Sequence, residues 1–160
     1  MDRLFASGRA AYVGKKREGD ACPFCIAAAS VHDASVYIVE RTPDILVLLN
    51  RYPYNAGHLL VVPVAHVADF ASLTPLVRAA IMEAVVCWTS RVQLALGCHG
   101  FNIGCNVGVV SGGSIPDHVH MHIVPRWQGD TNFLVTIGET KLVSRGLDEV
   151  FEKLMKLEGL

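Results

Sequence analysis

Three histidines at alternate positions constrain the fold of this chain more than any other feature. His118, His120 and His122 are separated by the single apolar residues Val119 and Met121. Successive side chains of a β-strand point to opposite faces, so a strand with this phase would place the three imidazoles on one face. We therefore predict a strand that packs on a core with its other face and presents three titratable rings close enough to share one ligand.

Length and charge define the general class of protein. The 160 residues are enough for one domain with a real core, and we predict a single domain over residues 21–160 after a basic arm, residues 1–20. The formal net charge of −1 does not favour a nucleic-acid or membrane-surface protein, but it is compatible with a small anionic ligand. The arm lacks the apolar stretch of a secretory signal, and the apolar runs 45–49 and 59–65 are well short of the roughly twenty residues that span a bilayer. We expect neither nucleic acid nor a membrane as a partner.

The cysteines indicate the redox compartment. There are five, an odd number, and three of them do not have disulfide-like spacing. A reducing compartment is the simpler interpretation, so we predict a cytoplasmic protein. In that setting the pair Cys22 and Cys25 is more consistent with a metal knuckle or a redox pair than with a structural bridge.

The pattern of apolar and turn residues predicts an α+β domain. Thr74 and Pro75 are typical of a helix start, and Gly97 of a helix end. The expected elements are a short helix over 25–30, a hairpin of strands 36–40 and 45–49, a buried strand over 59–63, a long helix over 75–96, a strand over 101–107, a glycine-rich loop over 108–116, the histidine strand and a C-terminal helix over 147–157. We predict an antiparallel sheet of about five strands with one long helix and a C-terminal helix.

The histidine strand suits two kinds of chemistry. Three neighbouring imidazoles could bind a metal, or one could attack a phosphorus centre while its neighbours donate hydrogen bonds. The bland alternative is three structural histidines, although three adjacent rings would repel one another when charged. The residues alone leave these alternatives open.

The surroundings of the strand resemble the histidine triad (HIT) family of nucleotide hydrolases and transferases. The pattern His-apolar-His-apolar-His-apolar-apolar follows Gly-Ser and precedes Pro125-Arg126. Residues 50–63, His66 and residues 100–108 are similar to the family's other blocks and come in the family's order. The similarity covers roughly residues 22–132 and implies a HIT-like fold.

The resemblance assigns roles to the three histidines, which it implies are the catalytic residues. His120 would attack an α-phosphorus and hold the nucleotidyl group as a phosphoramidate until an acceptor takes it. His122 and the backbone amides near Ser114 would donate to the non-bridging oxygens. His118, the first of the three, would complete the triad.

The resemblance also implies substrate-binding residues. The residue at Asn50 lies near the ribose hydroxyls in the family, while Asn102, Asn106 and Ser114 approach the phosphates. The alternative is ordinary turn and loop chemistry, for which these residue types are common. We expect His58, at the start of a buried strand, to be a structural hydrogen-bonding residue.

The loop before the triad departs from the commoner hydrolase-like branches of the family. Those carry Gly-Gln-Ser/Thr, whereas this chain has Gly112-Gly113-Ser114 and one more residue before His118. This loop resembles that of the bacterial diadenosine tetraphosphate phosphorylases, in which phosphate rather than water accepts the nucleotidyl group. Gly113 would leave room for a second anion, and Trp127 would either stack on a base or pack in the core.

A zinc site is also implied by the resemblance. Several triad proteins and the related galactose-1-phosphate uridylyltransferases hold one zinc with residues that correspond here to Cys22, Cys25, His66 and His118. Such a zinc would be structural and would tie the N-terminal segment to the histidine strand. The alternative is two reduced cysteines in a turn.

We expect nucleotidyl transfer on a dinucleoside polyphosphate, with inorganic phosphate as acceptor. The alternatives are a hydrolase of nucleotide phosphoramidates or dinucleoside polyphosphates that uses water, and a non-catalytic nucleotide-binding regulator. A hydrolase with the triad as zinc ligands ranks last, because the motif lacks an evident carboxylate base. Related domains pair through the long helix and an edge strand, so we also expect a homodimer or higher homo-oligomer, with Ile81, Val85 and Trp88 in either core or interface.

Overall fold

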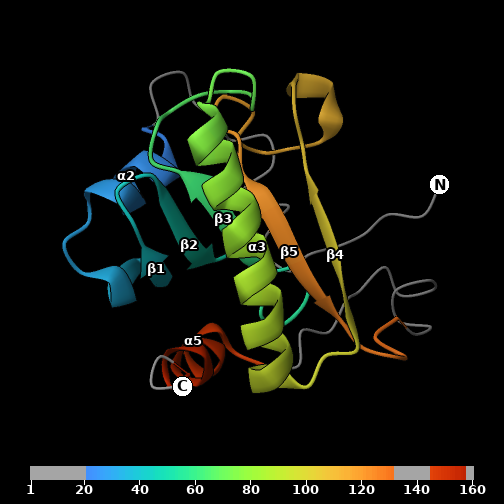
Figure 1. The fold of residues 1–160 in the computed structure, drawn as a ribbon. Coiled ribbons are helices and arrows are strands. Elements are labelled where there is room, and N and C mark those ends of the chain that lie inside the picture. Colours follow the sequence, from blue (N-terminus) through green and yellow to red (C-terminus); the bar gives the residue numbers. More distant parts are fainter. Residues whose placement is uncertain (1–20, 132–144, 158–160) are drawn as a thin grey trace.

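The computed structural model describes residues 21–131 and 145–157, and the predicted basic arm over residues 1–20 lies outside them. One antiparallel five-stranded sheet organises the described residues, as the sequence predicts (Figure 1). Its spatial order is β1-β2-β3-β5-β4, and the strands are β1 (Ile38–Arg41), β2 (Ile45–Leu49), β3 (Leu59–Pro63), β4 (Gly100–Cys105) and β5 (Met121–Arg126).

The long helix α3 (Pro75–Leu96) covers one face of the sheet (Figure 1). The Thr74 side chain accepts a hydrogen bond from the Val77 backbone N–H at 3.3 Å, and Gly97 ends the helix in the left-handed conformation with φ 64°. Ile81, Val85 and Trp88, which the sequence left between core and interface, are all buried in the core under the sheet. Helix α5 (Leu147–Met155) packs beside α3 and closes this core.

Length and composition alone would also allow α3 to cross a membrane. The core helix of a soluble protein meets the same criteria, and six residues of α3 are buried in the domain. All five cysteines are free thiols in the structure. A cytoplasmic location stays a prediction from cysteine usage.

The opposite face of the sheet carries a second, smaller core under helix α2 (Pro23–Ala29). Side chains of β2 and β3 alternate between the two cores, so that Val47 and Val61 face α3 while Leu48 and Leu60 face α2. Both strands are buried on both faces. The sheet is therefore the middle of three layers, with α3 on one face and α2 on the other.

The loop between β2 and β3, residues 50–58, is closed at its base by a bond from the Asn50 N–H to the His58 carbonyl, 2.8 Å. Gly57 has φ 75°, and a Cβ there would collide with the Leu96 side chain of α3. Only glycine fits this turn, which delivers His58 to the start of β3.

The observed elements differ from the predicted ones mainly at their ends. β1 begins at Ile38 rather than at residue 36, because Val36 ends the short 3₁₀ helix η1 (Asp33–Val36). The predicted loop 108–116 contains a second 3₁₀ turn, η2 (Val109–Ser111). The helix expected over 25–30 is α2, which begins two residues earlier, at Pro23, and ends at Ala29.

The largest difference concerns the histidine strand, because β5 begins only at Met121. His118 and His120 precede the strand, so the prediction of one strand holding all three histidines is wrong. The ladder between β3 and β5 ends at Val61 and Met121. Upstream of that pair the Val119 N–H donates to the Val67 carbonyl at 2.7 Å, so this part of the backbone has left the sheet.

Candidate active site

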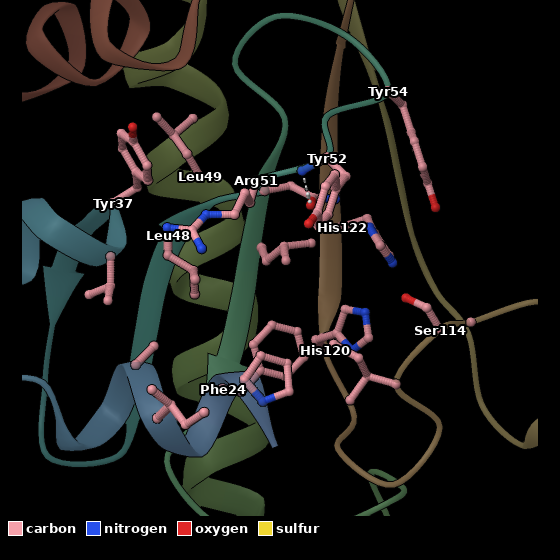
Figure 2. Close-up of a pocket in the computed structure, with 18 of the residues that line it drawn as sticks. Phe24, Tyr37, Leu48, Leu49, Arg51, Tyr52, Tyr54, Ser114, His120 and His122 are labelled. Carbon is pink, nitrogen blue, oxygen red and sulfur yellow. Dashed lines mark hydrogen bonds between the residues drawn. The ribbon is translucent and has the colours of Figure 1, made fainter. Parts of the chain in front are cut away.

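A pocket of about 290 Å³ lies between α2, the 50–54 loop and the glycine-rich loop (Figure 2). One part of its lining is apolar and comes from the second core, with Phe24, Ala27, Val36 and Leu48. The other part is mainly polar and includes Asn50, Asn106, Gly113, Ser114, His120 and His122. These six residues are ones that the sequence analysis singled out, and the fold brings them together.

His120 has its ring nitrogens in defined states. Its Nδ1 lies 2.9 Å from the His118 backbone carbonyl, which is an acceptor only, so Nδ1 carries the proton and donates. The lone pair is therefore on Nε2. Burial lowers the pKa of His120, which keeps the ring neutral. A buried, neutral imidazole with a bare nitrogen is suited to nucleophilic attack.

His122 is the second ring of the polar part. Its centroid lies 4.8 Å from that of His120, and Figure 2 shows both rings at the pocket with Ser114 across from them. Gly113 approaches Asn106 so closely that a Cβ on the glycine would lie 3.0 Å from the Asn106 Cβ. The glycine-rich loop thus borders the histidine pair without side-chain bulk at Gly113.

Two predicted substrate residues lie elsewhere. Asn102 is exposed on β4, and its Oδ1 accepts a hydrogen bond of 2.6 Å from Arg126 Nη1. Arg126 also binds Asp130 through two nitrogens, at 2.6 and 2.7 Å, and this pairing holds the pKa of Asp130 well below its usual range. Trp127 packs against the main core. The pocket lining contains neither Asn102 nor Trp127.

Several lining residues were not predicted. Tyr37, Arg51, Tyr52 and Tyr54 all border the pocket. Arg51, Tyr52 and Tyr54 lie in the block 50–63 that carries the family resemblance, so their neighbourhood was visible in the sequence although their side-chain directions were not. No Asp or Glu lines the pocket within the described ranges, so the carboxylate base that a metal hydrolase would need is not found there.

The four residues expected to hold zinc form one cluster. The ligand atoms of Cys22, Cys25, His66 and His118 all lie within 4.8 Å of one another. Cys22 Sγ is 3.3 Å from His118 Nδ1, and Cys25 Sγ is 3.2 Å from His66 Nδ1. In a tetrahedral zinc site with the usual Zn–S and Zn–N bonds, neighbouring donors lie about 3.3–3.8 Å apart. The donor types therefore fit zinc, and the two Cys–His distances of 3.3 and 3.2 Å are close to this spacing.

Residues around the cluster orient His118 for such a role. Its Nε2–H donates to the Pro63 carbonyl at 2.8 Å, which leaves the Nδ1 lone pair directed at the two thiols. His118 is buried and does not line the pocket, and burial lowers its pKa. Its position indicates a ligand of the cluster rather than a group in contact with a substrate.

Helix α2 connects the cluster to the pocket. Cys22 and Cys25 flank the first turn of α2, and Phe24 between them contacts the rings of His118 and His120 at centroid distances of 5.3 and 4.8 Å. Phe24 is also part of the apolar lining. The first turn of α2 thus contributes both to the Cys/His cluster and to the lining of the pocket.

The fold and the histidine pair agree with what a family model finds, because the HIT domain model matches residues 32–129. The chain belongs to the HIT family. It is 40% identical over 111 residues to the AP-4-A phosphorylase of Mycobacterium tuberculosis, an alignment that covers 69% of this chain and 57% of that protein. It therefore spans little more than half the length of this relative.

Two further comparisons bear on the same fold. The asymmetrical bis(5'-nucleosyl)-tetraphosphatase of Schizosaccharomyces pombe is 32% identical over 93 residues, which cover 58% of this chain and 50% of that protein. A zinc-bound histidine triad family protein from Mycobacterium smegmatis has a solved structure that superposes with a TM-score of 0.70, at 24% identity, over 85% of this chain and 91% of that one. The structural likeness confirms the predicted HIT-like fold.

Proposed function

We propose that the protein transfers a nucleotidyl group from a dinucleoside polyphosphate to inorganic phosphate through a covalent intermediate on His120. The observation that carries this proposal is the state of His120 in the pocket. The His118 carbonyl fixes its proton on Nδ1, so that Nε2 has a lone pair available for phosphorus. The apolar part of the pocket offers a surface for a nucleoside, and the glycine-rich loop offers backbone amides for phosphate.

The chemistry would proceed in two displacements. In the first, His120 Nε2 bonds to the α-phosphorus, the bond from phosphorus to the bridging oxygen breaks, and the remaining nucleoside polyphosphate leaves with that electron pair. In the second, an oxygen of inorganic phosphate bonds to the same phosphorus and the P–N bond breaks, which frees a nucleoside diphosphate and restores His120. Donors near His122 and Ser114 would stabilise the charge on the non-bridging oxygens.

Phosphate rather than water is favoured as acceptor by two observations. The loop has Gly113 where the hydrolase-like branches carry glutamine, so it lies against Asn106 without a side chain that could orient water. The M. tuberculosis relative at 40% identity is named a phosphorylase. Hydrolysis is the second candidate, because the S. pombe relative is named a tetraphosphatase.

The acceptor is tested by incubating the protein with diadenosine tetraphosphate, with and without inorganic phosphate, and by separating the products. We expect phosphate to speed turnover and to yield ADP and ATP in equal amounts. Formation of AMP and ATP at a rate that phosphate does not change would reject the phosphorylase and support the hydrolase.

The covalent step is tested with His120→Ala. We expect turnover to fall by at least about 1,000-fold, because removal of a nucleophile eliminates the covalent route. A radiolabelled adenylyl adduct, trapped by acid-free quenching in the absence of phosphate, should form on the wild type and not on the variant. His32→Ala, which removes an exposed histidine outside the pocket, is the matched control. A wild type that binds nucleotide without forming an adduct would instead be a regulator.

We also propose that Cys22, Cys25, His66 and His118 hold a structural zinc. The proposal is supported by the donor spacing and by the orientation of His118. The M. smegmatis structure with the same fold is described as zinc-bound. Zinc here would supply a fixed link between α2 and the segment that leads into β5, and no step of the reaction would pass through it.

The zinc proposal predicts about one zinc per chain in protein that has never met a chelator. Cys22→Ser should lower both the metal content and the melting temperature, by roughly 4–8 °C if about 2 kcal/mol is lost. Cys87→Ser removes an exposed thiol of α3 and should change neither. Metal-free protein that melts at the same temperature as its zinc-treated form would exclude the site.

A further inference from the structure

A chain of hydrogen bonds runs from the 50–54 loop through His58 to His122. The Tyr54 backbone N–H lies 3.1 Å from His58 Nδ1, and His58 Nε2 lies 2.9 Å from His122 Nδ1. Asn50 Nδ2 is 3.3 Å from the same His58 Nδ1. His58 is fully buried, so solvent does not compete for these bonds.

The first members of the chain determine where the proton of His58 resides. A backbone N–H donates only, so His58 Nδ1 must accept the bond from Tyr54. The Asn50 amide is oriented by the Tyr52 N–H, which donates to its Oδ1 at 3.0 Å and leaves the NH₂ group to face His58. Both neighbours therefore require a bare Nδ1, and the ring proton of neutral His58 is on Nε2.

The state of His122 follows from the state of His58. The His58 Nε2–H donates to His122 Nδ1, which must be the bare nitrogen of its own ring. The proton of neutral His122 is then on Nε2, a buried atom of a ring that lines the pocket. His122 thus presents an N–H rather than a lone pair.

His120 has the opposite arrangement although the two rings lie only 4.8 Å apart. Its Nδ1 is protonated because it donates to the His118 carbonyl. The two rings would otherwise be chemically equivalent, and either tautomer of a free imidazole is accessible. The backbone thus assigns one ring as the nucleophile directly and the other as a donor through His58.

We propose that His58 is a positioning residue that fixes the tautomer of His122, so that this ring donates to the phosphate oxygens while His120 attacks. The inference rests on the proposed function for its catalytic consequence, but the tautomers themselves do not depend on it. His58 would touch neither substrate nor reacting atoms. Its effect would pass through one hydrogen bond, that to His122 Nδ1.

Two substitutions separate this role from simple packing. The amide nitrogen of glutamine reaches about as far from the backbone as imidazole Nε2, so His58→Gln should keep a donor to His122. The amide of asparagine reaches only about as far as Nδ1, so His58→Asn should keep the partner of Tyr54 and lose the bond to His122. Both are polar and smaller than histidine, and they form a matched pair.

The decisive measurement is ¹⁵N NMR of protein with labelled histidines, because long-range ¹H–¹⁵N correlations distinguish protonated from bare ring nitrogens. The His122 signals are assigned by their loss in His122→Gln. We expect His122 to carry its proton on Nε2 in the wild type and in His58→Gln, and to show a mixture of tautomers in His58→Asn. A wild-type His122 protonated on Nδ1 would overturn the proposal, and this test needs no variant of His58 to fold.

Kinetics supplies the second readout. His58→Asn should lower kcat on the order of 10-fold or more with little change in KM, as expected when a donor to the transition state is lost, and His58→Gln should recover most of it. Equal losses in both variants would mean that His58 acts only by packing. If no dinucleoside polyphosphate is turned over while the tautomers are as expected, the proposed function fails and this inference stands.

Discussion

At the scale of single residues, Gly113 is where the choice of acceptor can be tested. The glycine packs so closely on Asn106 that a Cβ at this position would lie 3.0 Å from the Asn106 Cβ. We expect Gly113→Ala to raise the KM for inorganic phosphate by about 10-fold or more while the adduct on His120 still forms, because the added methyl group crowds Asn106 and the loop proposed to bind the acceptor. The measurement is turnover against phosphate concentration beside the yield of trapped adduct.

The control for this variant is Gly100→Ala. A Cβ at Gly100 would meet no atom within 4 Å, and Gly100 lies on β4 outside the pocket. Its phosphate dependence should match that of the wild type. A Gly113→Ala enzyme with an unchanged KM for phosphate would place the acceptor elsewhere and contradict the role given to the loop.

The asparagines show how far a sequence can predict residues of the site. Asn102 and Asn106 lie in the same family-like block, but only Asn106 lines the pocket. Asn102 of β4 is paired with Val124 of β5, two residues beyond His122. At that position its Oδ1 accepts a hydrogen bond from Arg126. This difference depends on the register between β4 and β5, which tertiary contacts set. Local pattern therefore identified the block but not which amide reaches the ligand.

At the scale of elements, Arg41 of β1 holds the helix that forms the wall of the pocket. Its guanidinium donates to the carbonyls of Ala27 and Ala28, at 3.2 and 2.8 Å, at the end of α2. It also pairs with Asp33 at 2.6 Å. The last carbonyls of a helix have no partners within the helix, so these bonds cap α2 and tie it to the sheet.

We predict that Arg41→Ala lowers stability on the order of 1–2 kcal/mol and weakens nucleotide binding, because α2 loses its anchor. Thermal unfolding and a titration with a non-cleavable nucleotide would measure the two effects. Arg41→Lys keeps the charge but lacks the planar fork that reaches several carbonyls, so it should rescue little. Full rescue by lysine would show that charge alone matters.

The elements themselves were largely predictable, and their ends were not. The five strands, α3 and α5 follow from apolar periodicity and from Thr74-Pro75 and Gly97. The start of β5 does not, because Val119 has the apolar character of a strand residue while its N–H bonds to Val67 in a different segment. Because the backbone leaves the β3–β5 ladder before Met121, the His118 side chain points to the cysteines instead of the pocket. The alternation of histidines in the sequence does not indicate where the strand begins.

At the scale of the whole molecule, one edge of the sheet is open. β4 pairs with β5 on one side only within the described residues, and its residues from Asn102 to Cys105 are exposed. Ile103 on this strand is 48% exposed, and Met82 and Val86 of α3 are also exposed. An open edge with apolar neighbours is a template for pairing with another strand. We propose that a second copy of the chain covers it.

The proposal predicts a homodimer in light scattering and sedimentation at micromolar concentration. Ile103→Lys should shift the protein toward monomer, because a buried lysine at the contact would lack a partner for its charge. Val31→Lys, which replaces an apolar residue that is 87% exposed ahead of η1, should leave the dimer intact. If the dimer forms through β4, only Ile103→Lys should dissociate it, since the two variants add the same charge at different places. A wild type that sediments as a monomer at every concentration would mean that β4 stays open, and equal dissociation by both lysines would place the contact elsewhere on the surface.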